Sequence, residues 1–276
     1  MTVLECVINV SEGRRSEVID ALAGAARPYL LDVHVDPDHH RTVLTLAGDD
    51  ALVGATRRVA GAAVAWIDLR HHAGAHPRLG AVDVVPFVPL DGSTMADALA
   101  ARAEFAAWAG SELGVPCFFY GPDLPRSEGP LGPGRTLPEV RRSAFTTVAP
   151  DAGPSTPHPT AGAICVGARP ILVAYNVWLA PGTPVETARA VAAAVRGPAL
   201  RALGLDVGGQ AQVSMNLIAP EQLSPADAYD AVAALTGVAR AELVGLLPRA
   251  VLEAIPAERW PELDLSPSRT IEARVG

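Results

Sequence analysis

Two periodicities of apolar residues divide the first half of the chain into short and long segments. Short runs rich in Val, Ile and Leu, such as residues 3–10, are typical of buried strands. Longer Ala-rich runs repeat apolar residues at helical spacing, so that Val18, Leu22 and Ala25 would share one helix face. We therefore predict strands at 3–10, 29–36, 41–48, 82–90 and 115–121. We also predict one helix that begins at Ser11 or Gly13, and two more at 49–67 and 94–113.

The order strand-helix-strand-strand-helix-strand is typical of an antiparallel sheet with helices packed on one face. Pro86 and Pro89 interrupt the strand at 82–90, and proline is tolerated mainly at sheet edges and strand ends. We therefore expect this strand to lie at an edge of its sheet or to end at a proline.

Residues 121–159 are dense in Pro and Gly and predict neither helix nor strand. A loop of this length is uncommon in a compact domain unless it has a function, so the stretch is either a linker or a set of functional loops. Regular patterns return after it, which predicts an α+β protein that uses the sheet-and-helix arrangement twice, with a weaker βαβα series in the second half. The expected segments are a strand at 169–180, a helix at 184–197, a strand at 211–220, further elements at 224–238 and 241–255, and a peripheral tail after Glu262.

Charge and composition argue against several classes of protein. The formal net charge of −8 and the lack of a basic stripe with aromatic residues argue against a general nucleic-acid binder. No apolar run reaches membrane-spanning length, and the N-terminus does not have the pattern of a signal peptide. The three cysteines are far apart and form no CxxC pair, which predicts neither a disulfide framework nor a cysteine zinc site. We therefore expect a cytoplasmic protein.

The segment RHHAGAHPRLG at residues 70–80 concentrates three of the seven histidines. On a helix, His72 and His76 would share one face as in HExxH zinc sites, but Gly74 and Pro77 argue against a helix and no glutamate follows His72. We predict no metal site here, and we interpret His71 and His72 as residues that end a helix. His76 differs because it precedes a proline in a glycine-flanked loop, where an imidazole can face a cleft and exchange protons.

Six motifs occur in order along the chain: ECVINVSEGR, DPDHHRT, HHAGAHPRLGAVDVVPFVP, GPSTPHPTAGAICVGAR, AYNVWL and QVSMNL. Together they resemble the formiminotransferase domain of the formiminotransferase-cyclodeaminase family. The resemblance extends from residue 4 to about residue 248, and no segment resembles the cyclodeaminase domain.

The resemblance implies two α/β subdomains, at residues 1–169 and 170–276, each an antiparallel or mixed sheet covered by helices in a ferredoxin-like arrangement, with a substrate groove between them. It also implies transfer of the formimino group of N-formimino-L-glutamate to N5 of tetrahydrofolate, a co-substrate, by a homodimer without a metal. The catalytic histidine of the family corresponds to His76. The folate-binding segment corresponds to Gly153, Pro154, Ser155, Thr156, Pro157, His158, Pro159, Thr160, Ala161 and Gly162.

Other polar residues of the motifs are candidates for substrate binding. Arg41 and Arg78 suit a substrate carboxylate. For Arg41 a surface ion pair is an equal alternative, whereas for Arg78, two residues from His76, we favour the binding role. Asp83 is a candidate for binding the pterin, for orienting His76 or for a structural role. Unpaired polar groups are costly to bury, so the polar residues in apolar strands either face a groove or bond to the backbone; they are Asn9, Gln212, Ser214 and Asn216.

The chain also departs from the family pattern. Ala75 replaces the usual Glu before the catalytic histidine, and His40 stands where Asn is usual. These departures keep two alternatives open: formyl transfer between 5-formyltetrahydrofolate and glutamate, or a folate-binding protein without catalysis. The histidine cluster leaves a third, a histidine-based metal hydrolase. The sequence does not decide the true donor, the polyglutamate preference or the oligomeric state.

Overall fold

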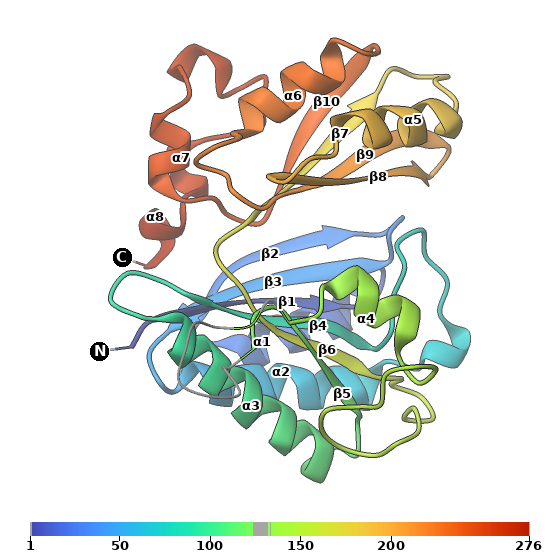
Figure 1. The fold of residues 1–276 in the computed structure, drawn as a ribbon, viewed down its shortest axis with the longest axis vertical. Helices are drawn as coiled ribbons and strands as arrows, with labels where there is room; N and C mark the ends of the chain where they lie inside the picture. The colour runs from blue at the N-terminus through green and yellow to red at the C-terminus, as the bar shows by residue number, and fades with distance from the viewer. Residues whose placement is uncertain (1, 124–131, 133, 276) are drawn as a thin grey trace. The chain divides into compact units, whose positions relative to one another are not determined.

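The computed structural model describes residues 2–123, 132 and 134–275. The chain forms two compact units, Met1–Pro170 and Ile171–Gly276 (Figure 1). Each unit contains one β-sheet with helices packed on it, so the predicted α+β class is confirmed.

The first unit is built on a six-stranded sheet with the order β2-β3-β1-β4-β6-β5. Its first six elements follow the predicted strand-helix-strand-strand-helix-strand order, and β1 pairs antiparallel with both β3 and β4. This is a ferredoxin-like arrangement, which is extended by β6, paired parallel with β4, and by β5, paired parallel with β6. The elements are β1 (Leu4–Val10), α1 (Ser16–Ala26), β2 (Leu30–Asp36), β3 (Arg41–Gly48), α2 (Leu52–Trp66), η1 (Leu69–His71), β4 (Val82–Pro89), α3 (Met95–Glu112), β5 (Cys117–Tyr120), α4 (Leu137–Ser143) and β6 (Ile164–Ala168).

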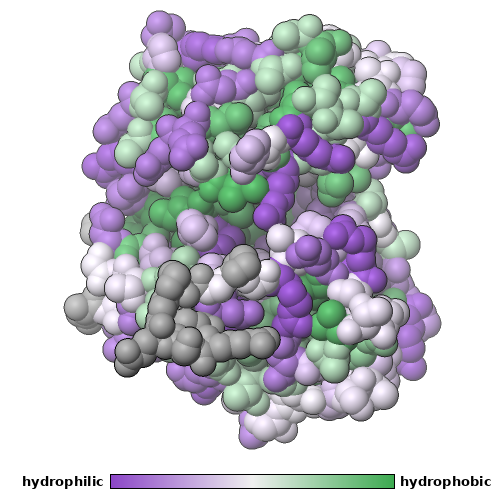
Figure 2. All heavy atoms as spheres, viewed as in Figure 1, coloured by the Kyte–Doolittle hydropathy of each residue, from purple (hydrophilic) through white to green (hydrophobic). Residues whose placement is uncertain are grey.

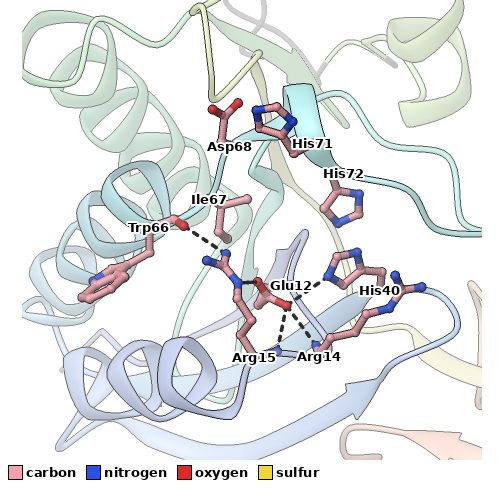
Figure 3. Close-up of a pocket in the computed structure, with 9 residues that line it drawn as sticks. All are labelled: Glu12, Arg14, Arg15, His40, Trp66, Ile67, Asp68, His71 and His72. Atoms are coloured by element: carbon pink, nitrogen blue, oxygen red, sulfur yellow. Dashed lines mark hydrogen bonds and ion pairs between the residues drawn. The ribbon is translucent and has the colours of Figure 1, made fainter.

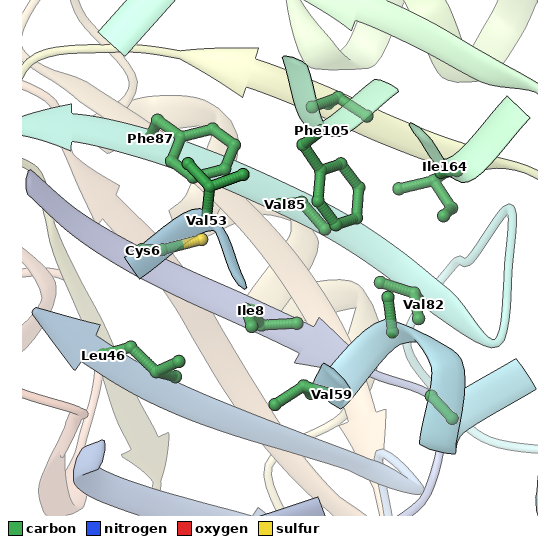
Figure 4. Close-up of a cluster of buried hydrophobic side chains, with 14 of the residues drawn as sticks. Cys6, Ile8, Leu46, Val53, Val59, Val82, Val85, Phe87, Phe105 and Ile164 are labelled. Atoms are coloured by element: carbon green, nitrogen blue, oxygen red, sulfur yellow. The ribbon is translucent and has the colours of Figure 1, made fainter. Parts of the chain in front are cut away.

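The main core of this unit lies between the sheet and helices α1, α2 and α3, which cover the same face (Figure 1). Alternate residues of β1 point into it because side chains of a strand alternate between faces. Cys6 and Ile8 are fully buried there, against Val59 of α2 and Phe105 of α3 (Figure 4). The opposite face of the sheet is consequently left to the residues in between, including Glu5, Asn9 and Arg41.

Helix α4 covers part of that opposite face. Val140 of α4 is fully buried in a small apolar cluster with Val84, Phe118 and Cys165 of β4, β5 and β6. A capping box starts the helix, since the Thr136 hydroxyl and the Glu139 carboxylate each accept from the other residue's backbone N–H. The helix therefore holds its charged residues at a fixed place over β4.

The second unit repeats the ferredoxin-like arrangement in a four-stranded antiparallel sheet with the order β10-β7-β9-β8. Ala211, Val213, Met215 and Leu217 of β9 face its apolar core, so the residues between them face the other way. The elements are β7 (Val173–Leu179), α5 (Val185–Val195), β8 (Leu200–Val207), β9 (Gln210–Leu217), α6 (Pro225–Ala233), β10 (Val238–Val244), α7 (Arg249–Glu253), η2 (Ala257–Arg259), η3 (Pro267–Arg269) and α8 (Ile271–Val275).

Several sequence predictions about elements are wrong. The strands β8 and β10 were not predicted: the segment of β8 is rich in Leu, Ala and Gly, and that of β10 is rich in Ala and charged residues, so neither has a clear strand pattern. The segment 121–159 contains the helix α4 despite its prolines, because Pro138 lies in the first turn, where proline is tolerated.

Two further corrections concern the first unit. The strand β4 lies inside the sheet rather than at its edge, although it ends at Pro89, as the second alternative predicted. No residue of β1 is paired with Pro86, which has no N–H to donate. Helix α1 begins at Ser16 instead of Ser11 or Gly13. The Ser11 hydroxyl donates to the carbonyl of Gly80, which ties the end of β1 to the loop before β4.

The surface of each unit is mixed in polarity. Figure 2 shows hydrophilic side chains over much of both units, with apolar residues in smaller groups among them. Among the described residues, none of the helices is both long and apolar enough to cross a membrane.

Candidate active site

His76 lies in the loop between η1 and β4, at one end of the first sheet. Its Nδ1 is 3.0 Å from Nη1 of Arg41 and 2.7 Å from the carbonyl oxygen of Pro77. Arg41 only donates, so it bonds to Nδ1 when this nitrogen carries no proton. The carbonyl of Pro77 only accepts, so it bonds to Nδ1 when this nitrogen is protonated. Among the described residues, Nε2 has no hydrogen-bond partner. That nitrogen is therefore available to a substrate.

The environment of His76 favours its neutral form. Burial lowers the pKa of the imidazole well below the usual 6.5, and the positive charges of Arg41 and Arg141 lower it further. The hydrogen bond to the carbonyl of Pro77 opposes this shift. A neutral imidazole is able to accept a proton, and the imidazolium formed here is a stronger acid than an ordinary one.

Asp83 joins the two arginines beside His76. Its side chain is fully buried, and one carboxylate oxygen lies 2.9 Å from Arg41 Nη1 and 2.5 Å from Arg141 Nη2. The other carboxylate oxygen accepts the backbone N–H of Leu79 at 2.7 Å. Two guanidinium groups thus share one carboxylate, which leaves one positive charge uncompensated within this group of three.

Asn9 fixes the orientation of Arg41. Its side-chain oxygen accepts from Arg41 Nε at 3.0 Å, while its amide nitrogen donates to the carbonyl of Val7. The predicted residues Asn9, Arg41, His76 and Asp83 therefore lie together in one hydrogen-bonded group. Their roles toward a substrate stay predictions.

Arg141 is a member of this group that the sequence prediction missed. It comes from α4, and its Nη1 donates to the carbonyl of Pro77 at 2.7 Å while its Nη2 contacts Asp83. The capping pattern Thr136-x-x-Glu139 was a readable signal for the start of a helix. No local pattern, however, shows that this helix lies over β4.

Arg78 is placed differently from Arg41. Its terminal nitrogens face the carbonyl oxygens of His39, His40 and His76 and the ring of His72. Its predicted role, to bind a substrate carboxylate, stays a prediction, but these contacts occupy its terminal donors with groups of the same chain.

The segment from Gly153 to Gly162 lies beside the loop that carries His76. Thr160 accepts the N–H of Leu69 and Ala161 accepts the N–H of Ala81, at 2.9 Å each. Gly80 permits this approach, because a Cβ there would lie 2.1 Å from the carbonyl oxygen of Ala163. His158 Nδ1 accepts from the backbone N–H of Ala161, so its proton lies on Nε2. The remaining residues of the segment, Pro154, Ser155, Thr156, Pro157 and Pro159, are exposed.

The other predicted residues belong to the second unit. Gln212, Ser214 and Asn216 follow one another on the face of β9 that points away from its core. Gln212 is buried, and neither of its amide atoms has a hydrogen-bond partner among the described residues. Ser214 is half-buried and Asn216 is exposed. A role for them in binding stays a prediction.

A cavity of about 390 Å³ borders the same loops in the first unit (Figure 3). At its floor the buried carboxylate of Glu12 accepts three backbone N–H groups, of Gly13, Arg14 and Arg15, and it also contacts Arg15 Nε and His40 Nε2. Burial raises the pKa of Glu12, but these hydrogen bonds outweigh it and hold the pKa at about 2. The cavity is lined by Glu12, Arg14, Arg15, His40, Trp66, Ile67, Asp68, His71 and His72.

Metal ligands are not grouped in the described part of the chain. No set of three or more His, Cys, Asp or Glu side chains there is arranged to hold a metal ion. Cys6, Cys117 and Cys165 are free and buried.

Comparisons with known proteins give the family. The family model of the formiminotransferase domain, N-terminal subdomain, matches residues 3–169. The chain belongs to the formiminotransferase family. Glutamate formimidoyltransferase of Streptococcus pyogenes serotype M1 is 34% identical over 276 residues, which cover 91% of this chain and 90% of that protein. Glutamate formimidoyltransferase of Thermoplasma acidophilum is 34% identical over 281 residues, with the same coverage.

Formimidoyltransferase-cyclodeaminase of Sus scrofa is 35% identical over 285 residues, which cover 91% of this formiminotransferase chain but 51% of the pig protein. The chain therefore spans about half the length of that relative. The predicted family and the predicted enzyme class, a transferase, are confirmed by these matches.

Proposed function

We propose that this formiminotransferase transfers the formimino group of N-formimino-L-glutamate to N5 of tetrahydrofolate, giving 5-formiminotetrahydrofolate and glutamate. The observation that carries the proposal is a loop histidine, His76, whose Nδ1 contacts Arg41 and whose Nε2 has no hydrogen-bond partner among the described residues, in a chain 34% identical to glutamate formimidoyltransferases over 91% of its length. Tetrahydrofolate enters this reaction as a co-substrate of histidine degradation and one-carbon metabolism.

The reaction requires two proton movements that one imidazole is able to perform in turn. The N5 amine attacks the amidine carbon, a bond forms between them, and the proton of N5 passes to Nε2 of His76. The bond from that carbon to the glutamate nitrogen then breaks, and the same proton passes from Nε2 to the departing nitrogen. Before the first step the single ring proton of neutral His76 is on Nδ1, which donates a hydrogen bond to the carbonyl of Pro77. Nε2 then carries no proton and is able to accept one.

The charge around His76 suits an anionic donor. Arg41 and Arg141 together carry one positive charge more than Asp83 neutralises. A substrate carboxylate near Arg41 would form a charge-assisted hydrogen bond and offset the repulsion that depresses the pKa of His76. Binding of the donor would thus make the imidazole a better base at the moment when a base is needed.

We assign tetrahydrofolate to the exposed part of the segment Gly153–Gly162, because the carbonyls of Thr160 and Ala161 at its C-terminal end bond to Leu69 and Ala81, on either side of the loop that carries His76. Holding two reactants in a productive orientation corresponds to effective molarities on the order of 10⁵ M or more, so this placement contributes as much as the proton transfer. We further propose that Gln212, Ser214 and Asn216 of the second unit bind substrate, and that the enzyme acts as a cytoplasmic homodimer.

An absorbance assay tests the proposed function. Tetrahydrofolate is incubated with the full chain and, in separate arms, with N-formimino-L-glutamate, N-formiminoglycine and N-formyl-L-glutamate. We expect a 5-formiminotetrahydrofolate product in the first arm at the highest rate. Formation of 5-formyltetrahydrofolate in the third arm instead would favour the formyl-transfer alternative, and tight tetrahydrofolate binding without product in any arm would favour a folate-binding protein.

A further inference from the structure

Arg78 connects two loops of the first unit that carry different parts of the candidate active site. One is the turn between β2 and β3, which is followed by Arg41, and the other is the loop at residues 72–80, which carries His76. Arg78 Nη2 donates to the carbonyl of His39 at 3.1 Å and to the carbonyl of His76 at 2.8 Å. A single nitrogen therefore holds the backbones of both loops.

The second terminal nitrogen of Arg78 is also engaged. Its Nη1 lies 3.3 Å from the carbonyl of His40 and 2.8 Å from the ring nitrogens of His72. Burial and the neighbouring charges of Arg78 and His40 lower the pKa of His72 to about 4, so its ring is neutral and has a nitrogen able to accept. The four terminal N–H groups of the guanidinium thus face four acceptors of this chain.

Glycine at position 74 makes the close contact of these loops possible. A Cβ there would lie 2.4 Å from the carbonyl oxygen of His39 and 2.5 Å from Arg78 Nη2. The contact is reinforced by His40, whose ring lies within 3.1 Å of the carbonyl of Ala73, and by the N–H of Ala75, which donates to the carbonyl of Asp38.

We propose that Arg78 is a positioning residue that holds the backbone of His76 in register with Arg41, instead of binding the substrate carboxylate. This inference rests on the proposed function, in which the positive charge of Arg41 beside His76 favours the neutral imidazole. Displacement of a catalytic group by about 1 Å is able to cost roughly 10²-fold in rate, so a fixed register between the loops matters for turnover.

The test compares Arg78→Lys, Arg78→Gln and Gly74→Ala with the wild-type chain. Lysine keeps the charge but not the planar fork that reaches four acceptors, and Gly74→Ala disturbs the same contact without changing any charge. We expect kcat to fall about 10²-fold in all three variants while KM for both substrates stays within about threefold. The control is Arg70→Gln, which is expected to leave kcat unchanged. Arg70 is exposed, and among the described residues its side chain bonds only to Asp68.

A second measurement does not depend on turnover. The pH titration of the His76 ring is followed by NMR in the substrate-free chain. In the three variants the imidazole is released from Arg41, so we expect its titration to move toward the pH range of an ordinary histidine. A tenfold rise in KM for formiminoglutamate with unchanged kcat in the Arg78 variants would overturn the inference, as would an unchanged titration of His76. Failure of the wild-type chain to turn over any donor would instead refute the proposed function and leave the NMR result to decide on Arg78.

Discussion

The guanidinium of Arg41 and the imidazole of His76 meet at one pair of atoms, Nη1 and Nδ1, 3.0 Å apart. Arg41 is the first residue of β3, and His76 comes from the loop before β4. Because Asn9 and Asp83 also bond to Arg41, the guanidinium is fixed on two sides before any substrate arrives. The protonation of His76 is therefore controlled by a cation that is itself held in place.

Replacement of His76 tests its role in proton transfer. We expect His76→Ala to retain tetrahydrofolate affinity and to lower kcat by about 10²–10⁴-fold, the usual contribution of a general acid–base group. Calorimetric titration with tetrahydrofolate and steady-state kinetics give the two quantities. His71→Ala is the control, since this histidine is exposed at the end of η1. Normal turnover by His76→Ala would exclude it as the base.

The pH dependence of kcat/KM tests the electrostatics. The active form of His76 is neutral, so kcat/KM falls as the pH drops below the pKa of the imidazole, which gives the pH profile an acidic limb. Burial and the charges of Arg41 and Arg141 lower this pKa, so we expect the limb to lie below pH 6.5. Arg41→Gln removes a nearby positive charge, and the limb is therefore expected to move to higher pH. Arg57→Gln, which disrupts an ion pair with Glu104, is a control without this shift. A limb that stays in place in Arg41→Gln would contradict this electrostatic account.

Replacement of Asp83 tests the cost of leaving two arginines without their carboxylate. We expect Asp83→Asn to lower the free energy of unfolding by about 3–5 kcal/mol, because Arg41 and Arg141 then repel each other near a buried amide. Urea denaturation measures this loss. Adding Arg141→Gln to Asp83→Asn is expected to recover part of it, and a double variant less stable than the single one would argue against charge repulsion as the cause.

Glu12 provides a pH-dependent contribution to stability. Its pKa is about 2 in the folded protein and 4.5 as a free side chain, so the stabilisation is complete above pH 4.5 and is lost as the pH falls through about 2. We expect Glu12→Gln to lower the free energy of unfolding by about 2–3 kcal/mol at pH 7. The difference from wild type is expected to shrink as the pH falls below 4.5. Glu17→Gln, on the exposed side of α1, is the matched control.

The comparison of sequence and structure shows where local patterns suffice. The first βαββαβ series was predictable because its strands and helices have clear periods, and the placement of His76 in a loop followed from Gly74 and Pro77. The strands β8 and β10 were not predictable, because three of the eight residues of β8 and two of the seven residues of β10 are exposed, and their apolar residues do not alternate cleanly. Pairing with β9 and β7 supplies the backbone hydrogen bonds that make them strands.

The sequence by itself determined the motifs, the family and the presence of a loop histidine beside cationic residues. Only the tertiary structure decided what those cations do. It directs the terminal donors of Arg78 to backbone carbonyls and the ring of His72, and it brings Arg141 from a distant helix onto Asp83. The physical reason is that a guanidinium bonds whatever acceptors the folded backbone presents to it. That geometry comes from the pairing of β1, β3 and β4, which no local spacing encodes.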